Sequence, residues 1–536
     1  MSGASTSTPP EGSAQLGLIV AGKPLDKAAS PETMGFKAYN LARMAALGLN
    51  VPPAFVLGTG FCAHPETATP ALWHDALVRL EAATGLGFGD PRRPLLLSVR
   101  SGAPVSMPGM METLLNIGLT EATLPGLIRS TGNPRLAWDA YRRLIAGYGE
   151  VVAGVNATDF EADLDAVRLG EEERMLDFAV LRDIAQRHLE TYRRLAGEAF
   201  PQDAVAQLQA AIAAVFRSWS SAKAIAYREM RGLSHGMGTA VTVQRMVFGN
   251  AGGLSGAGVG FTRNPSDGNP APWVDFLFNA QGEDVVSGRR SAQGHDRLAA
   301  IAPRVWEELV EAAKALERHF GDMQDFEFTI EDGKLFLLQT REGKRTPQAA
   351  ARIALDMADE GLIDRETACL RTAGLDAAAL TTRIIVAEDG AAPTVLGHAA
   401  TASSGVVSGA VALNEAQVAA LETEGKPAIL ARQNAETDDI ALLERVQGLL
   451  TRHGARTSHA AVVARQLGKV CLVGCEAMRI DESSDRIGLG ETWLDPGAVI
   501  TLDGNSGTIF AGASRTAEQV PAELLQRLDR LHATKG

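Results

Sequence analysis

A histidine at the start of an apolar helix is the strongest candidate for chemistry in this sequence. His459 lies in the segment Thr457-Ser458-His459-Ala460-Ala461, before an apolar stretch that ends at Leu467. Thr457 and Ser458 are both suitable N-caps, which places His459 in the first turn of the helix. We expect the helix dipole to lower the pKa of the imidazole there. A neutral imidazole is a nucleophile for phosphorus, and a structural histidine is the alternative.

A glycine-containing loop could hold a phosphate chain. The loop Ser101–Thr113 follows Arg100 and contains Gly102 and Gly109 among small residues. Loops of this kind present backbone N–H groups to anions. Because glycine-bearing turns between a strand and a helix are common, the pattern alone allows phosphate binding without requiring it.

Three polar side chains lie on the two arms of a predicted hairpin. The sequence FEFTIEDGKLFLLQT alternates around an Asp-Gly pair, which predicts two antiparallel strands joined by a tight turn. Glu327, Gln339 and Arg341 have matching parity on these arms, so we expect them on one face of the sheet. Glu327 could ligate Mg²⁺ and Arg341 could pair with phosphate, and a solvated strand face is the alternative.

The periodicity of the chain indicates the elements that must position these groups. Apolar residues at three- and four-residue spacing predict helices over most of residues 120–230. Short β-rich runs separated by glycine, asparagine and aspartate predict a sheet over 239–342. An alanine-rich helical stretch follows at 347–380, and residues 403–512 have the pattern of a compact α/β unit. In the tail, Leu524, Leu528 and Leu531 share one helical face, which we expect to pack back onto the chain, with docking onto another protein as the alternative.

The composition excludes several classes of protein. The chain has 536 residues, of which 46% are hydrophobic and 21% charged, so it can form several cores without cross-links. Its net charge of −13 disfavours nucleic acid as a partner. Four cysteines are too few for a disulfide framework, and Cys471 and Cys475 fit buried apolar thiols better than a metal site. We see no membrane-spanning run and no signal peptide, and we therefore expect a cytoplasmic protein.

Six segments together resemble the pyruvate, phosphate dikinase family and, more distantly, phosphoenolpyruvate synthase. They are LLLSVRSGAPVSMPGMMETLLNIGL, GTAVTVQRMVFGN, GVGFTRNPSDG, FLFNAQGEDVVSGRR, DFEFTIEDGKLFLLQTREGKRT and RTSHAAVVARQLGKVCLVGC. The first five are similar to the family's ATP-grasp nucleotide-binding domain, and the last is similar to its swivelling phosphohistidine domain. The segments are long and in the family's order, so chance does not explain them.

The resemblance implies an α/β (α+β) multidomain fold, with an ATP-grasp domain followed by a swivelling β/β/α phosphohistidine domain. We expect a flexible leader over 1–30, the ATP-grasp domain over 31–345, a helical segment and linker over 346–402, the phosphohistidine domain over 403–512 and a tail helix over 513–536. The chain ends about where the family's pyruvate-binding barrel should begin, so we expect the acceptor site on a separate chain.

The resemblance also assigns roles to individual residues. It makes His459 the phospho-carrier and counts Arg100 and Arg341 with it as catalytic. Residues expected to hold the nucleotide and inorganic phosphate are Lys37, Arg100, Gly109, Met110, Thr113, Arg143, Gln244, Met246, Val247, Glu327, Gln339 and Arg341. Glu327 and Gln339 are the expected Mg²⁺ ligands, and the strand Gln244–Val247 is expected to meet adenine through its backbone. Arg143 is preferred over Arg142, although two adjacent arginines leave that choice open.

The activity implied is a phosphotransferase partial reaction with ATP and Mg²⁺. ATP and inorganic phosphate would phosphorylate His459 with release of AMP and pyrophosphate. The phosphoryl group would then pass to pyruvate or another acceptor on a separate protein that carries a pyruvate or phosphoenolpyruvate site. Thr457 is a candidate for regulatory phosphorylation, with a helix cap as the alternative. We expect no nucleic-acid or membrane partner, and a homodimer is left open.

Departures from the family pattern keep two other functions open. Phe36 stands where the family tends to have glycine, and the loop before His459 carries His453 and Arg456 as extra polar residues. One alternative is direct phosphorylation of a small molecule, as in rifampin phosphotransferase, although there is little room for an inserted acceptor domain. The other is a catalytically silent nucleotide-binding regulatory module. No key residue of the family is visibly lost, which favours the enzyme.

Overall fold

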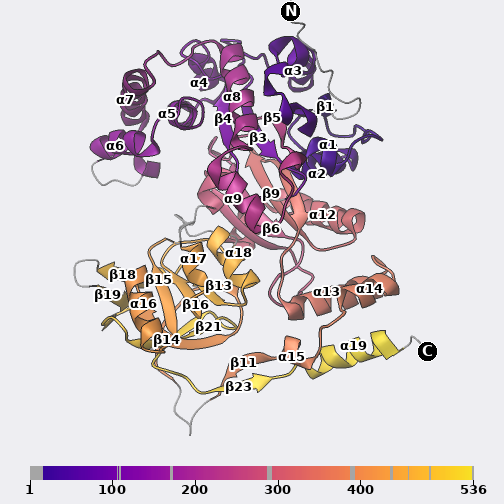
Figure 1. Ribbon diagram of the computed structural model, residues 1–536, viewed down its shortest axis with the longest axis vertical. Helices are drawn as coiled ribbons and strands as arrows, with labels where there is room; N and C mark the ends of the chain where they lie inside the picture. The colour runs from indigo at the N-terminus through magenta and orange to yellow at the C-terminus, as the bar shows by residue number, and fades with distance from the viewer. Residues whose placement is uncertain are drawn as a thin grey trace, which may run out of the picture. The chain divides into compact units, whose positions relative to one another are not determined.

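The chain folds into two compact units. The computed structural model describes residues 16–105, 107, 110–168, 173–286, 293–386, 393–434, 439–456, 458–481 and 485–533, with only the backbone of Arg174, Glu283, Val286, Gln293, Ile440 and His459. Unit 1 comprises Met1–Gly252 with Phe336–Gln339, and unit 2 comprises Gly253–Leu335 with Thr340–Gly536 (Figure 1). No helix in the described part of the chain is long and apolar enough to span a membrane.

Unit 1 is an antiparallel sheet with helices packed on one face. Its strands run in the order β1-β2-β5-β3-β4, and every pairing is antiparallel. The strands are β1 (Leu16–Ile19), β2 (Ala54–Leu57), β3 (Leu97–Gly102), β4 (Thr113–Ile117) and β5 (Ala240–Arg245). The helices are α1 (Pro31–Met34), α2 (Phe36–Ala46), α3 (Pro70–Thr84), α4 (Leu124–Thr131), α5 (Pro134–Val151), α6 (Ala157–Arg168), α7 (Phe178–Ala196), α8 (Ala204–Ser218) and α9 (Ala222–Met230). The predicted helices over 120–230 are confirmed.

Alternation along the strands of unit 1 separates an apolar from a polar face. Val99 and its neighbours Leu114 and Val243 belong to the core that the helices cover. Since side chains alternate along a strand, Ser98 and Arg100 point to the opposite face. The candidate phosphate-binding residues of β3 therefore lie on the face turned away from the helical core.

Unit 2 begins with a second antiparallel sheet, of order β10-β9-β6-β7-β8. Its elements are β6 (Gly256–Phe261), β7 (Trp273–Phe278), α10 (Gly282–Val286), β8 (Gln293–Gly294), α11 (His295–Ile301), α12 (Pro303–Phe320), β9 (Gln324–Glu331) and β10 (Lys334–Glu342). The predicted hairpin is confirmed: Asp332 and Gly333 join β9 to β10 with φ of 48° and 76°. Positive φ at both residues is what a two-residue hairpin turn requires.

Alternate glycines on β6 make room for aromatic rings. A Cβ on Gly258 would lie 2.4 Å from the ring of Phe328, and one on Gly256 would lie 2.1 Å from the ring of Phe276. These two rings stack 5.8 Å apart on that face. The opposite face therefore carries the other residue set of β6, β7 and β9, which includes the polar residues of the candidate site.

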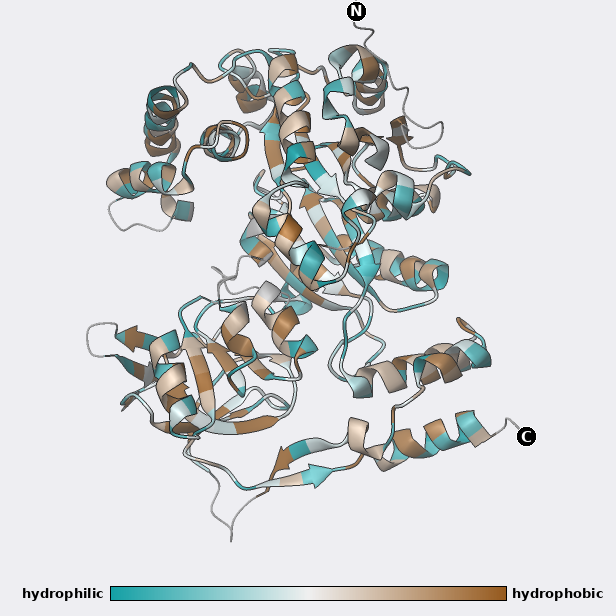
Figure 2. Ribbon diagram, in the orientation of Figure 1, coloured by the Kyte–Doolittle hydropathy of each residue, from teal (hydrophilic) through white to brown (hydrophobic). Residues whose placement is uncertain are grey.

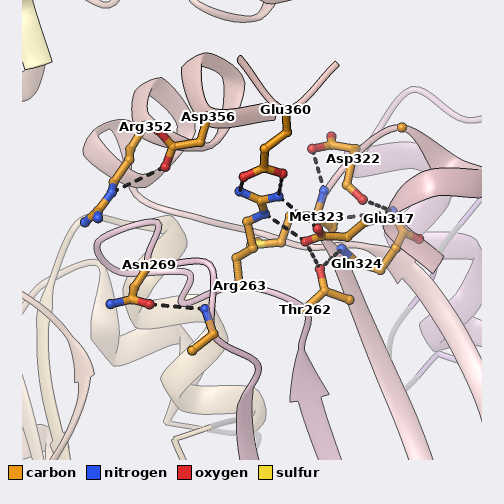
Figure 3. A network of polar contacts seen from close by, with 12 residues as sticks. Thr262, Arg263, Asn269, Glu317, Asp322, Met323, Gln324, Arg352, Asp356 and Glu360 are labelled. Atoms are coloured by element: carbon orange, nitrogen blue, oxygen red, sulfur yellow. Dashed lines mark hydrogen bonds and ion pairs between the residues drawn. The ribbon is translucent and has the colours of Figure 1, made fainter. Parts of the chain in front are cut away.

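A buried ion-pair network joins the following helices to this sheet (Figure 3). Arg263, which follows β6, donates from Nε to Glu317 on α12 at 2.9 Å and from Nη2 to Glu360 at 2.6 Å. Glu360 ends helix α13 (Pro347–Asp359), which α14 (Arg365–Arg371) and α15 (Ala377–Leu380) follow. Burial lowers the pKa of the Arg263 guanidinium, but the two carboxylates outweigh this, so its pKa is raised.

The helical segment is closed by the C-terminal helix α19 (Ala522–Ala533). Leu528 is buried against Leu355 of α13 and Leu380 of α15, and Figure 2 shows apolar and polar bands alternating along α19. Arg527 donates to Asp356 at 2.7 Å. The prediction that the leucine face of the tail packs back onto the chain is confirmed.

The rest of unit 2 is a three-layer β/β/α domain. An eight-stranded sheet runs in the order β12-β22-β21-β14-β15-β16-β17-β13, and β14 to β17 are parallel. Helices α16, α17 and α18 cover one face, and the small sheet β18-β19-β20 covers the other. The elements are β12 (Val395–His398), β13 (Ala400–Ser403), β14 (Val406–Ala412), α16 (Glu415–Thr423), β15 (Ala428–Arg432), α17 (Ile440–Leu443), β16 (Gly448–Thr451), α18 (His459–Gln466), β17 (Val470–Val473), β18 (Met478–Asp481), β19 (Arg486–Leu489), β20 (Thr492–Leu494), β21 (Val499–Asp503) and β22 (Thr508–Ala511).

Both chain connections of this domain meet in one β-ribbon. Strand β11 (Thr382–Ile385) enters the domain and pairs antiparallel with β23 (Thr516–Gln519), which leaves it. Residues 395–402, which the sequence pattern predicts as part of a linker, contribute β12 and most of β13 to the eight-stranded sheet. The connection is thus a paired ribbon, and a two-stranded ribbon bends more readily than the sheets on either side.

Candidate functional site

Lys37 lies against the end of β3, close to Arg100. The amide of Phe36 donates to the carbonyl of Ala103 at 2.9 Å, which joins the first turn of α2 to the residues after β3. A Cβ built on Gly102 would lie 3.8 Å from Cβ of Lys37. Arg100 is two residues earlier on the same strand. The structure therefore brings together two cations that the family resemblance assigns to phosphate binding.

Arg100 also has Thr113 as a direct neighbour across the sheet. In the ladder, Arg100 pairs with Thr113 on β4 and with Thr242 on β5. Directly paired residues point to the same face, with Cα atoms about 5 Å apart. The hydroxyl of Thr242 is buried and has no hydrogen-bond partner among the described residues. A phosphate oxygen could satisfy that group, so Thr242 is a candidate that sequence reasoning missed.

The predicted adenine strand is largely engaged within the protein. Gln244 pairs with Ala54 on one side and Ser98 on the other, and its side-chain amide donates to the carbonyl of Pro52 at 3.0 Å. The amide of Met246 donates to the carbonyl of Leu96 at 2.8 Å. The chain leaves the sheet after Arg245, so the stretch that follows, with the buried Val247, is where backbone groups could meet a base.

The methionines of the phosphate loop pack in an apolar cluster. Gly109 lies outside the described residues. Met110 is partly buried against a cluster that contains Met107 and Trp219. Its side chain contributes packing to this cluster.

The two adjacent arginines of α5 differ in exposure. The side chain of Arg142 is 6% exposed and that of Arg143 is 32% exposed. Both pair with Asp139 and Glu173: Arg142 approaches Asp139 at 2.6 Å, and Arg143 approaches Glu173 at 2.9 Å. The more exposed guanidinium of Arg143 is better placed to meet a dissolved anion, because a larger part of it is accessible from solvent.

In unit 2, Arg341 is held between two carboxylates. Its Nε donates to Asp325 at 2.8 Å. Burial raises the pKa of Asp325, and Arg341 opposes that rise only in part. Burial lowers the pKa of Arg341, but Asp325 and Glu327 outweigh it and the pKa is raised. Arg341 is therefore a fixed cation on the hairpin, and Asp325 is a second residue that sequence reasoning missed.

The register of the second sheet places its acidic residues on one face. Val259 of β6 pairs with Glu327 on β9 and with Asp275 on β7. In the next row, Phe261 pairs with Asp325 and Trp273. Rows two residues apart share a face, and neighbouring strands lie about 4.8 Å apart. Asp275 and Glu327 are thus on the same face, separated by two strand spacings. Gln339, the other predicted metal ligand, is a buried residue of β10 that belongs to unit 1.

His459 begins helix α18, as predicted. Ser458 is the N-cap, and its hydroxyl accepts a hydrogen bond from the amide of Ala461. Thr457, the candidate regulatory residue, lies outside the described residues. His453 on the same loop contacts Asn434 at 3.2 Å.

Two arginines hold α18 against the second sheet. Arg456, three residues before His459, donates to Asp275 at 2.8 Å. Arg465, near the end of α18, lies 5.6 Å from the ring centroid of Phe261 and 5.4 Å from that of Trp273. The helix that begins with His459 therefore rests on the face that carries Asp325 and Glu327.

Comparisons with known proteins match both parts of this architecture. The model of the family described as "Pyruvate phosphate dikinase, AMP/ATP-binding domain" matches residues 64–300 and 295–362. The model described as "PEP-utilising enzyme, mobile domain" matches residues 424–507. An ATP-grasp-like nucleotide-binding domain joined to a mobile phosphohistidine domain is thus the class of protein that fold and site define.

Similar proteins from bacteria and plants show which family within this class the chain belongs to. The pyruvate, phosphate dikinase of Rhizobium meliloti (strain 1021) is 42% identical over 516 residues, which cover 92% of this chain and 57% of the relative. The dikinase of Clostridium symbiosum is 41% identical over 512 residues, which cover 92% of this chain and 58% of the relative. The chloroplastic pyruvate, phosphate dikinase 1 of Oryza sativa subsp. japonica is 40% identical over 501 residues, which cover 92% of this chain and 53% of the relative. The chain belongs to the pyruvate, phosphate dikinase family, and it spans little more than half the length of these relatives.

Proposed function

We propose that this protein transfers a phosphoryl group from ATP to His459. The observation that carries the proposal is the position of helix α18. Arg456 and Arg465 hold it against the sheet face that bears Glu327 and the Asp325–Arg341 pair. This position supports the proposal that a nucleophile at the start of the helix can reach residues suited to bind a polyphosphate. Phosphoryl transfer needs mainly such positioning and neutralisation of charge.

Several side chains are suited to bind the phosphates and the Mg²⁺ of a nucleotide. In unit 1, Lys37, Arg100 and Arg143 are cations suited to phosphate, and in unit 2 Arg341 is such a cation. Arginine forks suit phosphate oxygens because they donate two parallel hydrogen bonds. Glu327 of unit 2 could supply a carboxylate oxygen for Mg²⁺, and Gln339 of unit 1 is the other ligand that the family resemblance assigns. No cluster of three ligating side chains occurs among the described residues, and Mg²⁺ bound with a nucleotide needs only one or two carboxylates. The residues fit that mode of binding.

The reaction that the family implies runs in two steps at His459. The imidazole attacks the β-phosphorus of ATP, the bond to the α-phosphate oxygen breaks, and AMP leaves. An oxygen of inorganic phosphate then attacks the γ-phosphorus, pyrophosphate leaves, and one phosphoryl group stays on the histidine. We propose that this group passes to pyruvate or to another acceptor bound on a separate chain.

The test follows label from ATP into the protein. Purified protein with Mg²⁺ and ATP labelled at the β-phosphate should gain acid-labile label and release AMP, and pyrophosphate should form only when inorganic phosphate is present. His459→Asn should abolish the label. His453→Asn, a histidine on the same loop that contacts Asn434, is the matched control and should keep it. Absence of label in a folded protein that still binds ATP would refute the proposal and favour a regulatory module. Loss of the label on adding pyruvate together with a separate protein that carries a pyruvate site, with phosphoenolpyruvate formed, would identify the acceptor.

A further inference from the structure

The guanidinium of Arg456 makes three contacts with three successive residues of β7. Its Nε donates to the carboxylate of Asp275 at 2.8 Å. Its Nη2 donates to the carbonyl of Val274 at 2.9 Å. Its centre lies 4.2 Å from the ring centroid of Trp273, within the range of a cation–π contact. One side chain of the mobile domain thus engages charge, backbone and ring on a single strand of the nucleotide-binding sheet.

The geometry points to Arg456 as a docking residue that latches the mobile domain onto this sheet. It acts by position: it determines how often His459 is presented to the nucleotide, and it takes no part in the bonds that form and break. This inference rests on the proposed function, because presentation matters only if His459 receives a phosphoryl group.

The burial of the pair suits a contact that forms and breaks. The side chain of Asp275 is 1% exposed and that of Arg456 is 19% exposed. Docking removes both charges from water, and that desolvation offsets much of their attraction. When the mobile domain leaves the sheet, water returns to both groups. The pair therefore determines where the domain docks and contributes only a modest net free energy to docking. A latch that must open in every catalytic cycle needs this balance.

The loop that carries Arg456 is fixed from within the mobile domain. Arg465 donates from Nε to the carbonyl of Ala402 at 2.9 Å and from Nη2 to the carbonyl of Arg456 at 3.2 Å. These bonds hold the backbone at Arg456 without using the side chain of Arg456. Shortening the side chain of Arg456 should therefore leave the loop in place and remove only the contacts to β7.

The first experiment compares Arg456→Gln with Arg479→Gln. Arg479 lies 5.3 Å from the ring centroid of Trp493, and both residues belong to the small sheet of the mobile domain. The control thus removes an arginine–tryptophan contact without touching β7. Oxidation by hydroxyl radicals, measured by mass spectrometry, reports the exposure of each tryptophan. Arg456→Gln should raise the oxidation of Trp273 and leave Trp493 unchanged, whereas Arg479→Gln should do the reverse.

The same variants separate docking from nucleotide binding. Removing one partner of a buried charge pair should lower the docking equilibrium by roughly 30-fold or more. The rate at which His459 is labelled at saturating ATP should fall with it, while the dissociation constant for ATP should rise by no more than the coupling factor between docking and nucleotide binding. High salt should slow the wild type towards the variant and slow the variant little. A change in ATP affinity of similar size would overturn the docking role.

Asp275→Asn and the double variant test the pairing itself. If the two side chains form the latch, each single variant should expose Trp273 and the double variant should be no worse than the more affected single variant. Additive effects, or no change in Trp273 oxidation in any variant, would overturn the inference. If the wild type takes up no label at all, the proposed function fails, and the oxidation measurements still decide whether Arg456 docks the domain.

Discussion

Gly35 is the residue through which the position of Lys37 can be tested. It precedes α2 with φ 74° and ψ 151°, a conformation that is nearly exclusive to glycine. A Cβ at this position would lie 1.8 Å from the carbonyl oxygen of Gly102, whereas real Cβ atoms stay 3.0 Å or more from such atoms. Gly35→Ala therefore forces the start of α2 away from the end of β3 by roughly 1 Å, and Lys37 moves with it away from Arg100. A displacement of that size at a catalytic group costs on the order of 10²-fold in rate.

The control for this variant is Gly48→Ala. Gly48 follows the same helix with φ 79°, and a Cβ there would have no neighbour within 4 Å. It bears a conformational cost of about 1–2 kcal/mol without a clash, against roughly 1–3 kcal/mol plus the displacement for Gly35→Ala. The assay is single-turnover labelling of His459, with thermal unfolding of both variants alongside. Slow labelling by Gly35→Ala alone is the expected result. Equal rates in two folded variants would show that the contact between α2 and β3 does not position a catalytic group.

Two further predictions concern buried charges. Arg263→Met leaves Glu317 and Glu360 without their shared cation and should destabilise the junction of α12 and α13 by about 3–5 kcal/mol. Hydrogen exchange in peptides from α13 measures this loss of stability. Arg527→Met removes a more exposed ion pair and should have a much smaller effect. Burial raises the pKa of Asp139, but Arg142, Arg143 and Arg135 outweigh it and the pKa is lowered. The stability that Asp139 contributes is therefore complete above about pH 4 and lost as the pH falls further. Thermal unfolding between pH 3 and pH 6 should show a steeper acid loss in the wild type than in Asp139→Asn, and parallel curves would contradict this.

Local sequence signals were sufficient for the elements that carry the chemistry. The Asp-Gly pair predicts the hairpin because Asp332 and Gly333 must both take positive φ in a tight turn. Ser458 caps α18 because its hydroxyl reaches the amide of Ala461, three residues on. Both features depend on residues only a few positions apart, and such short-range rules are visible in one sequence. The assignments of Lys37, Arg143 and Gln339 to the nucleotide remain predictions, because no described contact tests them.

Long-range contacts could not be obtained in the same way. Arg456 and Asp275 are 181 residues apart, and nothing in either segment indicates that they meet. Asp325 has the parity of Glu327, yet only the contact with Arg341 distinguishes it from an ordinary strand residue. Thr242 becomes a candidate because the ladder places it beside Arg100. In each case the partner is supplied by packing of the whole domain, which pattern and propensity do not determine.

The charges on the face of the second sheet connect docking to nucleotide binding. Asp275, Asp325 and Glu327 lie on that face, and Arg341 is the cation that the hairpin itself provides. Arg456 and Arg465 reach it from the mobile domain. A polyphosphate bound there adds several negative charges, so it makes the arrival of two arginines more favourable. By the reciprocity of linked equilibria, the docked domain must then increase the affinity of the site for the anion by the same factor. Loss of anionic charge on this face, when AMP and pyrophosphate leave, would weaken the hold on Arg456 and release the domain with its phosphorylated histidine.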